Sequence, residues 1–178
     1  MWLPFLPTSI RNFLHKAGFI SLANHTQVSK KIDGAEELDS GVVQNLMNIL
    51  TATEVYLRAA HPKDYEALRD TGAFEVSRSL SIFQATSIRL VYTAQQLRNG
   101  QDMSGQTESG VFLSRIDDSL WITRGVELFS TEVARQLSKL FHGVEGQAFS
   151  FLDSMMQTRG DPDAVILKLS AYGFDSEV

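Results

Sequence analysis

The chain has 178 residues, no cysteine and a formal net charge of −5 at pH 7. This length suits one domain, or one domain with an appendage, because a single core usually serves roughly 100 to 200 residues. The lack of cysteine excludes disulfides, thiolate zinc sites and thiol nucleophiles, and it is typical of a reducing, intracellular compartment such as the cytoplasm or the nucleus. The 16 Lys and Arg residues are scattered, which argues against a nucleic-acid-binding face.

The first ten residues, MWLPFLPTSI, are largely apolar, but two prolines interrupt them. A signal peptide or a membrane span needs an uninterrupted apolar run, of about 7 to 15 or about 20 residues, so we expect neither here and no membrane partner. We interpret residues 1–7 as the cut edge of a longer chain. Trp2, Leu3 and Phe5 would then form an interaction patch, covered either by this domain or, as we favour, by an upstream segment.

Apolar residues at helical spacing predict four helices in the first part of the chain. In the longest of them, Asp39 or Ser40 is the N-terminal cap, and the helix ends before Pro62. Pro62 opens the next helix, which Gly72 terminates. The four predicted helices cover residues 9–18, 26–32, 40–60 and 62–68.

The pattern changes to that of β-strands from Phe74 onwards. Apolar residues interspersed with Ser, Thr and Arg predict two strands between residues 74 and 96. Residues 98–107, RNGQDMSGQT, are almost entirely polar and predict a mobile surface loop. A strand, a turn at Asp117-Asp118-Ser119 and a second strand follow within residues 109–124.

Three further helices are predicted after this hairpin. Ser130 or Thr131 caps the first, and Asp161 followed by Pro162 opens the last. They lie within residues 130–143, 149–156 and 161–173.

This order of elements predicts an α+β fold in one domain over residues 1–178. We expect N-terminal helices, a small antiparallel sheet of about four strands, and C-terminal helices that pack on the sheet. The stripe of Val133, Leu137 and Phe141 should close over strands that carry Ile88, Leu90, Leu113 and Ile122.

Much of the chain resembles a known family. The resemblance is carried by residues 3–22, by residues 39–74, and by the hairpin with the helix EVARQLSKLFHG that follows it. Together these segments resemble a late, C-terminal region of very large fungal proteins of unassigned function, which are similar to sacsin and to the plant NO VEIN protein. In such proteins an ATPase domain of the histidine-kinase and Hsp90 type precedes long regions without assigned activity. The resemblance implies a scaffold or interaction region, whose partner is a protein or another domain of the same large chain.

The ATPase motif of that family is not reproduced in this chain. The motif places a Glu and an Asp around Gln-Asn on a helix, followed by an Asp-x-Gly-x-Gly turn. Around Gln44-Asn45, Gly41 and Asn48 stand where the two acids would be. In the downstream segment DTGAF, Phe74 replaces the second glycine. We therefore expect no nucleotide and no other cofactor.

The remaining polar side chains are interpreted as structural. Neither the histidines nor the adjacent carboxylates have the spacing of a metal site or of an acid/base pair facing one pocket. We predict no catalytic and no metal-ligating residue, and the leading hypothesis is a non-catalytic structural or interaction module. The residues weighed are His15, His25, His61, His142, Glu36-Glu37 and Asp117-Asp118.

Two alternatives are kept. In the first, the chain is a small anion- or nucleotide-binding domain or an enzyme, and Arg89, Arg115 and Arg124 form an anion pocket if they share one face of the sheet. In the second, an exposed strand edge binds a peptide and residues 98–107 act as a gate.

Overall fold

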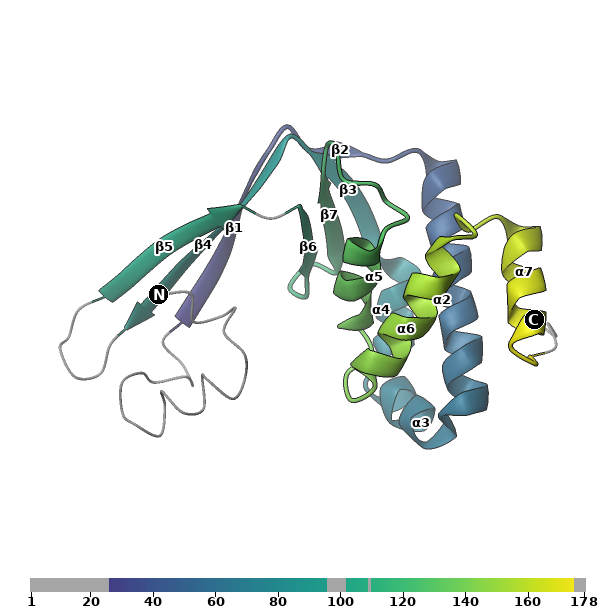
Figure 1. Cartoon of the computed structure of the whole chain (residues 1–178). Helices are drawn as coiled ribbons and strands as arrows, with labels where there is room; N and C mark the ends of the chain where they lie inside the picture. Colours follow the sequence, from purple (N-terminus) through teal and green to yellow (C-terminus); the bar gives the residue numbers. More distant parts are fainter. Residues whose placement is uncertain (1–25, 96–101, 109, 175–178) are drawn as a thin grey trace.

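The computed structural model has the α+β fold that the sequence predicts, with helices gathered on one side and two sheets on the other (Figure 1). The predicted helix at residues 9–18 and the patch of Trp2, Leu3 and Phe5 lie outside the described part of the chain. The structure describes residues 26–95, 102–108 and 110–174.

Helix α2 (Ser40–Ala60) is the long helix of the fold and begins where the sequence predicts. Its cap is Asp39, whose carboxylate accepts hydrogen bonds from two backbone N–H groups of the first turn, at 3.0 and 3.4 Å. Helix α3 (Pro62–Asp70) follows at once, with its proline at the start, where no backbone N–H is needed. These two helices confirm the predicted boundaries closely.

Helix α4 (Ala73–Ser79) occupies the segment where we expected a strand to begin. Gly72, with a φ of 77°, ends the preceding turn and leads directly into this helix. The predicted β structure from Phe74 is therefore wrong as far as residue 79. Phe74 and Ser77 are buried on one face of α4, and over so few residues an apolar and polar mixture does not distinguish a strand from a one-turn or two-turn helix.

Four strands form one sheet: β2 (Glu36–Glu37), β3 (Ser81–Ala85), β6 (Val111–Ser114) and β7 (Ser119–Thr123). Their order across the sheet is β2–β3–β7–β6. β6 and β7 form the predicted antiparallel hairpin, and β2 is antiparallel to β3. β3 and β7 are parallel, so this sheet is mixed rather than entirely antiparallel.

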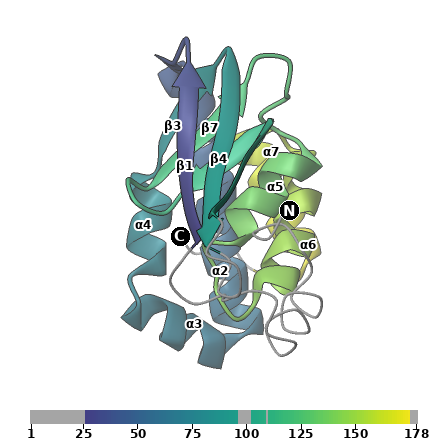
Figure 2. The same cartoon turned by 90° about the vertical axis from the view of Figure 1, so that its left-hand side faces the viewer.

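A second sheet contains β1 (Thr26–Asp33), β4 (Ser87–Gln95) and β5 (Asp102–Glu108), in the order β1–β4–β5 with antiparallel pairing throughout. It projects away from the helices (Figure 1), and Figure 2 shows β1 and β4 side by side. Two predictions are corrected here. The helix expected at residues 26–32 is strand β1, and residues 102–107 of the expected loop belong to strand β5. Both segments pair with β4, a contact between distant parts of the chain that outweighs local preference.

The three C-terminal helices are α5 (Thr131–Ser138), α6 (Glu145–Met156) and α7 (Pro162–Ala171). Two of the predicted caps are confirmed. The Ser130 hydroxyl accepts a hydrogen bond from the third residue of its helix at 3.4 Å, and the Asp161 carboxylate does the same at 3.0 Å. Helix α6 begins before the predicted segment 149–156.

The main hydrophobic core lies between the helices and the four-stranded sheet. Val133, Leu137 and Phe141 are completely buried there, in one cluster with Leu113 and Ile122. This confirms that the predicted stripe closes over the hairpin.

A second, smaller cluster lies where the two sheets meet. Ile88 of β4 and Ala85 of β3 are buried in it, and Ile32, Phe112 and Trp121 pack around them. We had expected Ile88 to lie under the α5 stripe. It lies instead in this second cluster, outside the main core, so that part of the prediction is wrong. The side chain of Leu90 lies outside what the structure describes.

Candidate functional site

The three arginines of the predicted anion pocket each bind a different acceptor. Arg89 donates to Asp33 at 3.1 Å, and Arg124 donates to Glu36 at 2.5 Å. Arg115 donates to the backbone carbonyl of Lys139 at 3.0 Å. Arg115 precedes β7 and Arg124 follows it, so these two lie at opposite ends of that strand. The structure therefore gives the pocket no support.

The two histidines within the described residues have structural contacts. His61 is the C-terminal cap of α2, in agreement with the predicted end of this helix before Pro62, and its Nε2 lies 3.4 Å from the Tyr56 hydroxyl. His142 Nδ1 lies 2.9 Å from the Glu145 carboxylate. In the described part of the chain, no group of three or more potential ligands could hold a metal ion.

The predicted turn residues brace the β6–β7 connection. Asp117 accepts a hydrogen bond from the Ser119 hydroxyl at 2.6 Å. Asp118 has a φ of 47°, and its carbonyl accepts from the backbone N–H of Ser81 at 3.1 Å. Within this turn Ile116 is 95% exposed. The Asp117 carboxylate and the Asp118 backbone thus serve the turn, in agreement with their interpretation as turn residues.

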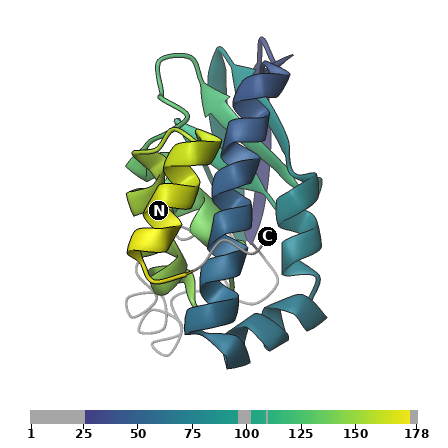
Figure 3. The same ribbon diagram turned by 90° about the vertical axis from the view of Figure 1, so that its right-hand side faces the viewer.

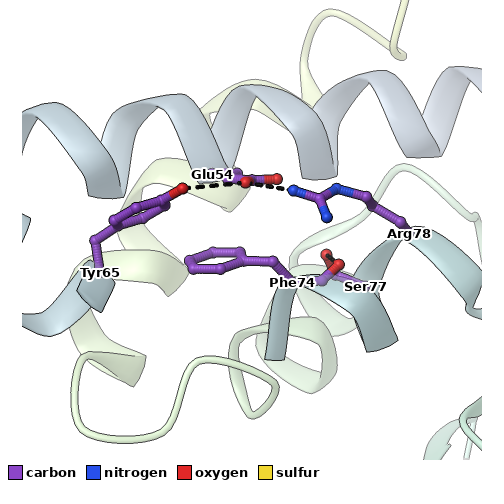
Figure 4. Close-up of polar contacts among 5 residues, drawn as sticks. All are labelled: Glu54, Tyr65, Phe74, Ser77 and Arg78. Atoms are coloured by element: carbon purple, nitrogen blue, oxygen red, sulfur yellow. Dashed lines mark hydrogen bonds and ion pairs between the residues drawn. The ribbon is translucent and has the colours of Figure 1, made fainter. Parts of the chain in front are cut away.

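A polar cluster joins helices α2, α3 and α4 (Figure 4). The Glu54 carboxylate of α2, only 14% exposed, accepts hydrogen bonds from Arg78 at 2.5 Å and from the Tyr65 hydroxyl at 3.5 Å. The Tyr65 ring packs on Phe74, with ring centroids 4.9 Å apart. Every charged member has a partner within the cluster, so its role is to tie α3 and α4 to α2.

A polar cavity of about 470 Å³ lies between the start of α5 and the end of α6. Arg159, on its wall, pairs with Glu127 and stacks over Phe129, with its guanidinium carbon 5.4 Å from the ring centroid. Asp153 accepts a hydrogen bond from the Thr131 hydroxyl at 2.7 Å. The Thr131–Asp153 bond ties α5 to α6, and Arg159 and Glu127 pair with each other at the edge of the cavity.

An apolar groove of about 240 Å³ runs between α2 and α7. Figure 3 shows the two helices side by side. From α2 come Thr51, Ala52 and Val55, and from α7 come Val165, Ile166 and Leu169. Ile166 is 46% exposed. Its neighbour Leu167, further round α7, is 74% exposed.

A charged residue follows the lining residues at each end of this groove: Asp163 comes directly after Pro162, and Arg58 comes three residues after Val55. Asp163 lies in the first turn of α7, and Arg58 lies in the last turn of α2. Neither forms an ion pair with another residue of the described chain. An apolar floor with a charged residue near each end offers shape and charge complementarity to a protein segment.

The sequence contained a signal for this groove that periodicity alone did not reveal. The segment Val165-Ile166-Leu167 is followed by Leu169, so α7 is apolar over more than one face. Only the placement of α7 on α2 shows which of these side chains stay exposed: Val165 and Leu169 are buried, whereas Ile166 and Leu167 are not.

No described helix is long and apolar enough to cross a membrane. Comparison of the chain with protein-family models, curated proteins and solved structures gives no match.

Proposed function

We propose that the chain is a non-catalytic interaction module that binds a protein partner through the groove between α2 and α7. The observation that carries this proposal is an apolar groove with Ile166 left 46% exposed on its rim. Burial of an Ile or Leu side chain contributes about 1.5 to 3 kcal/mol relative to leaving it in water. Because Ile166 is already about half buried, a partner that covered the groove would gain roughly half of that free energy from this side chain.

The partner is, in this proposal, another domain of the same large chain or a separate protein. The resemblance of residues 3–22 and 39–74 to the sacsin and NO VEIN-like proteins supports a place in a large multidomain protein whose ATPase domain lies elsewhere. The module would act as a scaffold or pass nucleotide-driven movement to a client. The lack of cysteine supports an intracellular site of action, in the cytoplasm or the nucleus.

Site-specific photocrosslinking in cells tests the proposal. A photoreactive amino acid replaces Thr51, an exposed residue on the wall of the groove, and the matched control carries it at Glu66, an exposed residue of α3. We expect a discrete adduct from position 51, absent from position 66 and lost when Ile166→Lys is added. Equal adducts from both positions, or an adduct that Ile166→Lys does not affect, would contradict the proposal.

A thermal melt with and without millimolar Mg-ATP tests the non-catalytic part. A ligand that binds only the folded state raises the melting temperature. We expect a cooperative melt that nucleotide does not shift. A clear upward shift would favour the nucleotide-binding alternative.

A further inference from the structure

Helices α2 and α7 run in the same direction. In the middle of α2, the Asn48 side chain donates a hydrogen bond to the carbonyl of Gly160, just before α7, at 3.0 Å. Near their C-terminal ends, the rings of Tyr56 and Tyr172 lie 6.5 Å apart. Helix α7 therefore begins beside the middle of α2, and the C-terminal ends of the two helices lie together at the far end of the groove.

The macrodipoles of two neighbouring parallel helices point the same way and reinforce each other. Each helix carries a partial positive charge at its N-terminus and a partial negative charge at its C-terminus, so the groove lies between two aligned dipoles. A third helix placed in the groove would be favoured electrostatically when it runs antiparallel to both. Helix α6 already has this relation to α2: Phe151 stacks on Tyr56 at 4.3 Å, and α6 then leads to Gly160 beside Asn45.

The charges at the ends of the groove select the same direction. Helices in general favour acidic residues in the first turn and basic residues in the last. An antiparallel helix would place its own first turn beside Arg58 and its last turn beside Asp163. Both ends would then be complementary in charge, whereas a parallel helix of the same composition would meet like charges at both ends.

We propose that the groove binds an amphipathic helix of a protein partner, antiparallel to α2 and α7, with acidic residues beside Arg58 and basic residues beside Asp163. This inference rests on the proposed function and specifies the partner. Thr51 and Val55 line the groove from α2 at a spacing of four residues, Ala59 follows at the same spacing, and Ile166 lines the groove from α7. The partner helix would present a matching stripe of apolar residues at i, i+3 or i+4, and i+7. About three turns would cover the distance from Asn48 to Ala59, since an α-helix rises about 1.5 Å per residue.

Two synthetic helical peptides form the probe. Both carry the same leucine stripe; one has Glu in its first turn and Lys in its last, and the other has these charges exchanged. Binding to the isotope-labelled chain is followed by NMR at low salt. We expect shifts in the backbone signals of residues 51, 55 and 166, and an affinity about threefold or more higher for the first peptide. Equal affinity of the two peptides, or shifts confined to other surfaces, would overturn the inference.

A charge exchange in the chain itself gives the sharper test. In the double variant Arg58→Glu, Asp163→Lys, the second peptide should bind more tightly than the first. The matched control, Arg69→Glu with Glu66→Lys, makes the same exchange on exposed residues of α3 and should leave the original preference unchanged. Preference for the first peptide in both variants would contradict the charge assignment.

A spin label at the N-terminus of the first peptide reports orientation directly. We expect broadening of signals near Arg58, and broadening near Asp163 instead would show a parallel helix and overturn the inference. In that case the groove would still bind a protein segment, so the proposed function would stand.

If neither peptide binds and the chain dimerises in a way that Thr51→Arg abolishes, the occupant is a second copy and the inference fails. If neither peptide binds and the photocrosslink is also absent, both proposals fail.

Discussion

Gly160 lies directly against the backbone of Asn45, so that a Cβ atom built at position 160 would fall 1.9 Å from the Asn45 carbonyl oxygen. Gly160 also has a φ of 70°, in the region that favours glycine. This close approach fixes the start of α7 on α2 and thereby sets the position of the groove. The groove thus depends on one backbone contact between residues far apart in the sequence.

Gly160→Ala should therefore destabilise the fold strongly. The left-handed backbone alone costs about 1 to 2 kcal/mol for a residue with a Cβ, and the clash with a backbone atom adds to this cost because α2 cannot yield as a flexible side chain would. Denaturant unfolding measures the change. The control is Gly143→Ala, where φ is 96° but nothing lies within 4 Å of the added Cβ. Equal losses at the two positions would show that the contact with Asn45 has no energetic consequence.

Leu137→Ala should cost about 2 to 5 kcal/mol, because it opens a cavity in the main core. Leu137 of α5 is completely buried in the core, on the side of the helix that packs on the hairpin. Leu167→Ala makes the same chemical change at a side chain that is 74% exposed, and it should change stability little. Thermal or denaturant melts of the two variants compare the positions directly. A melting curve for Leu137→Ala that matches the parent would contradict the packing of α5 on the sheet.

Local signals in the sequence were sufficient where a helix boundary depends on its own residues. Asp39, Ser130 and Asp161 cap the helices that they were predicted to cap, because a short side-chain oxygen can bond the first free N–H groups without any help from the rest of the fold. The hairpin turn at Asp117-Asp118 is local in the same sense.

Predictions failed where pairing between distant segments decides the structure. The segment TQVSKKID is largely polar, with only Val28 and Ile32 apolar, and it forms strand β1 by pairing with β4 along its whole length. The polar segment DMSGQTE likewise forms β5 on the other side of β4. The groove was not predictable for the same reason, since it arises from the contact of Gly160 with Asn45.

Glu54 and Arg78 should show a measurable coupling in a double-mutant cycle. Their contact at 2.5 Å joins α2 to α4, and the Glu54 side chain is mostly buried whereas that of Arg78 is 56% exposed. Exposure of one partner limits the coupling to about 0.5 to 1 kcal/mol. The cycle uses Glu54→Gln, Arg78→Met and the double variant in denaturant unfolding. Strictly additive effects would show that the ion pair does not stabilise the junction of these helices.

The lowered pKa of the Glu145 carboxyl leads us to expect that the free energy of unfolding falls in acid. Its pKa is lowered chiefly by the hydrogen bond from its own backbone N–H, with further contributions from the N–H of Gly143 and from His142, while partial burial acts in the opposite direction. A carboxyl whose pKa is lower in the folded state stabilises the fold above its unfolded-state pKa, about 4.3 for Glu. This contribution is lost as the pH falls through the lower, folded-state pKa.

Glu145→Gln should therefore reduce the slope of stability against pH on the acid side of that value. The variant should be less stable than the parent at neutral pH, where the carboxylate accepts the Gly143 N–H at 3.0 Å, and the difference should shrink as the pH falls. Urea unfolding at several pH values between about 3 and 7 measures this difference. NMR titration of the Glu145 carboxyl carbon supplies an independent reading of its pKa. A difference between variant and parent that stays constant over the whole range would show that the charge of Glu145 does not stabilise the start of α6, and would leave only the neutral hydrogen bonds to account for that turn.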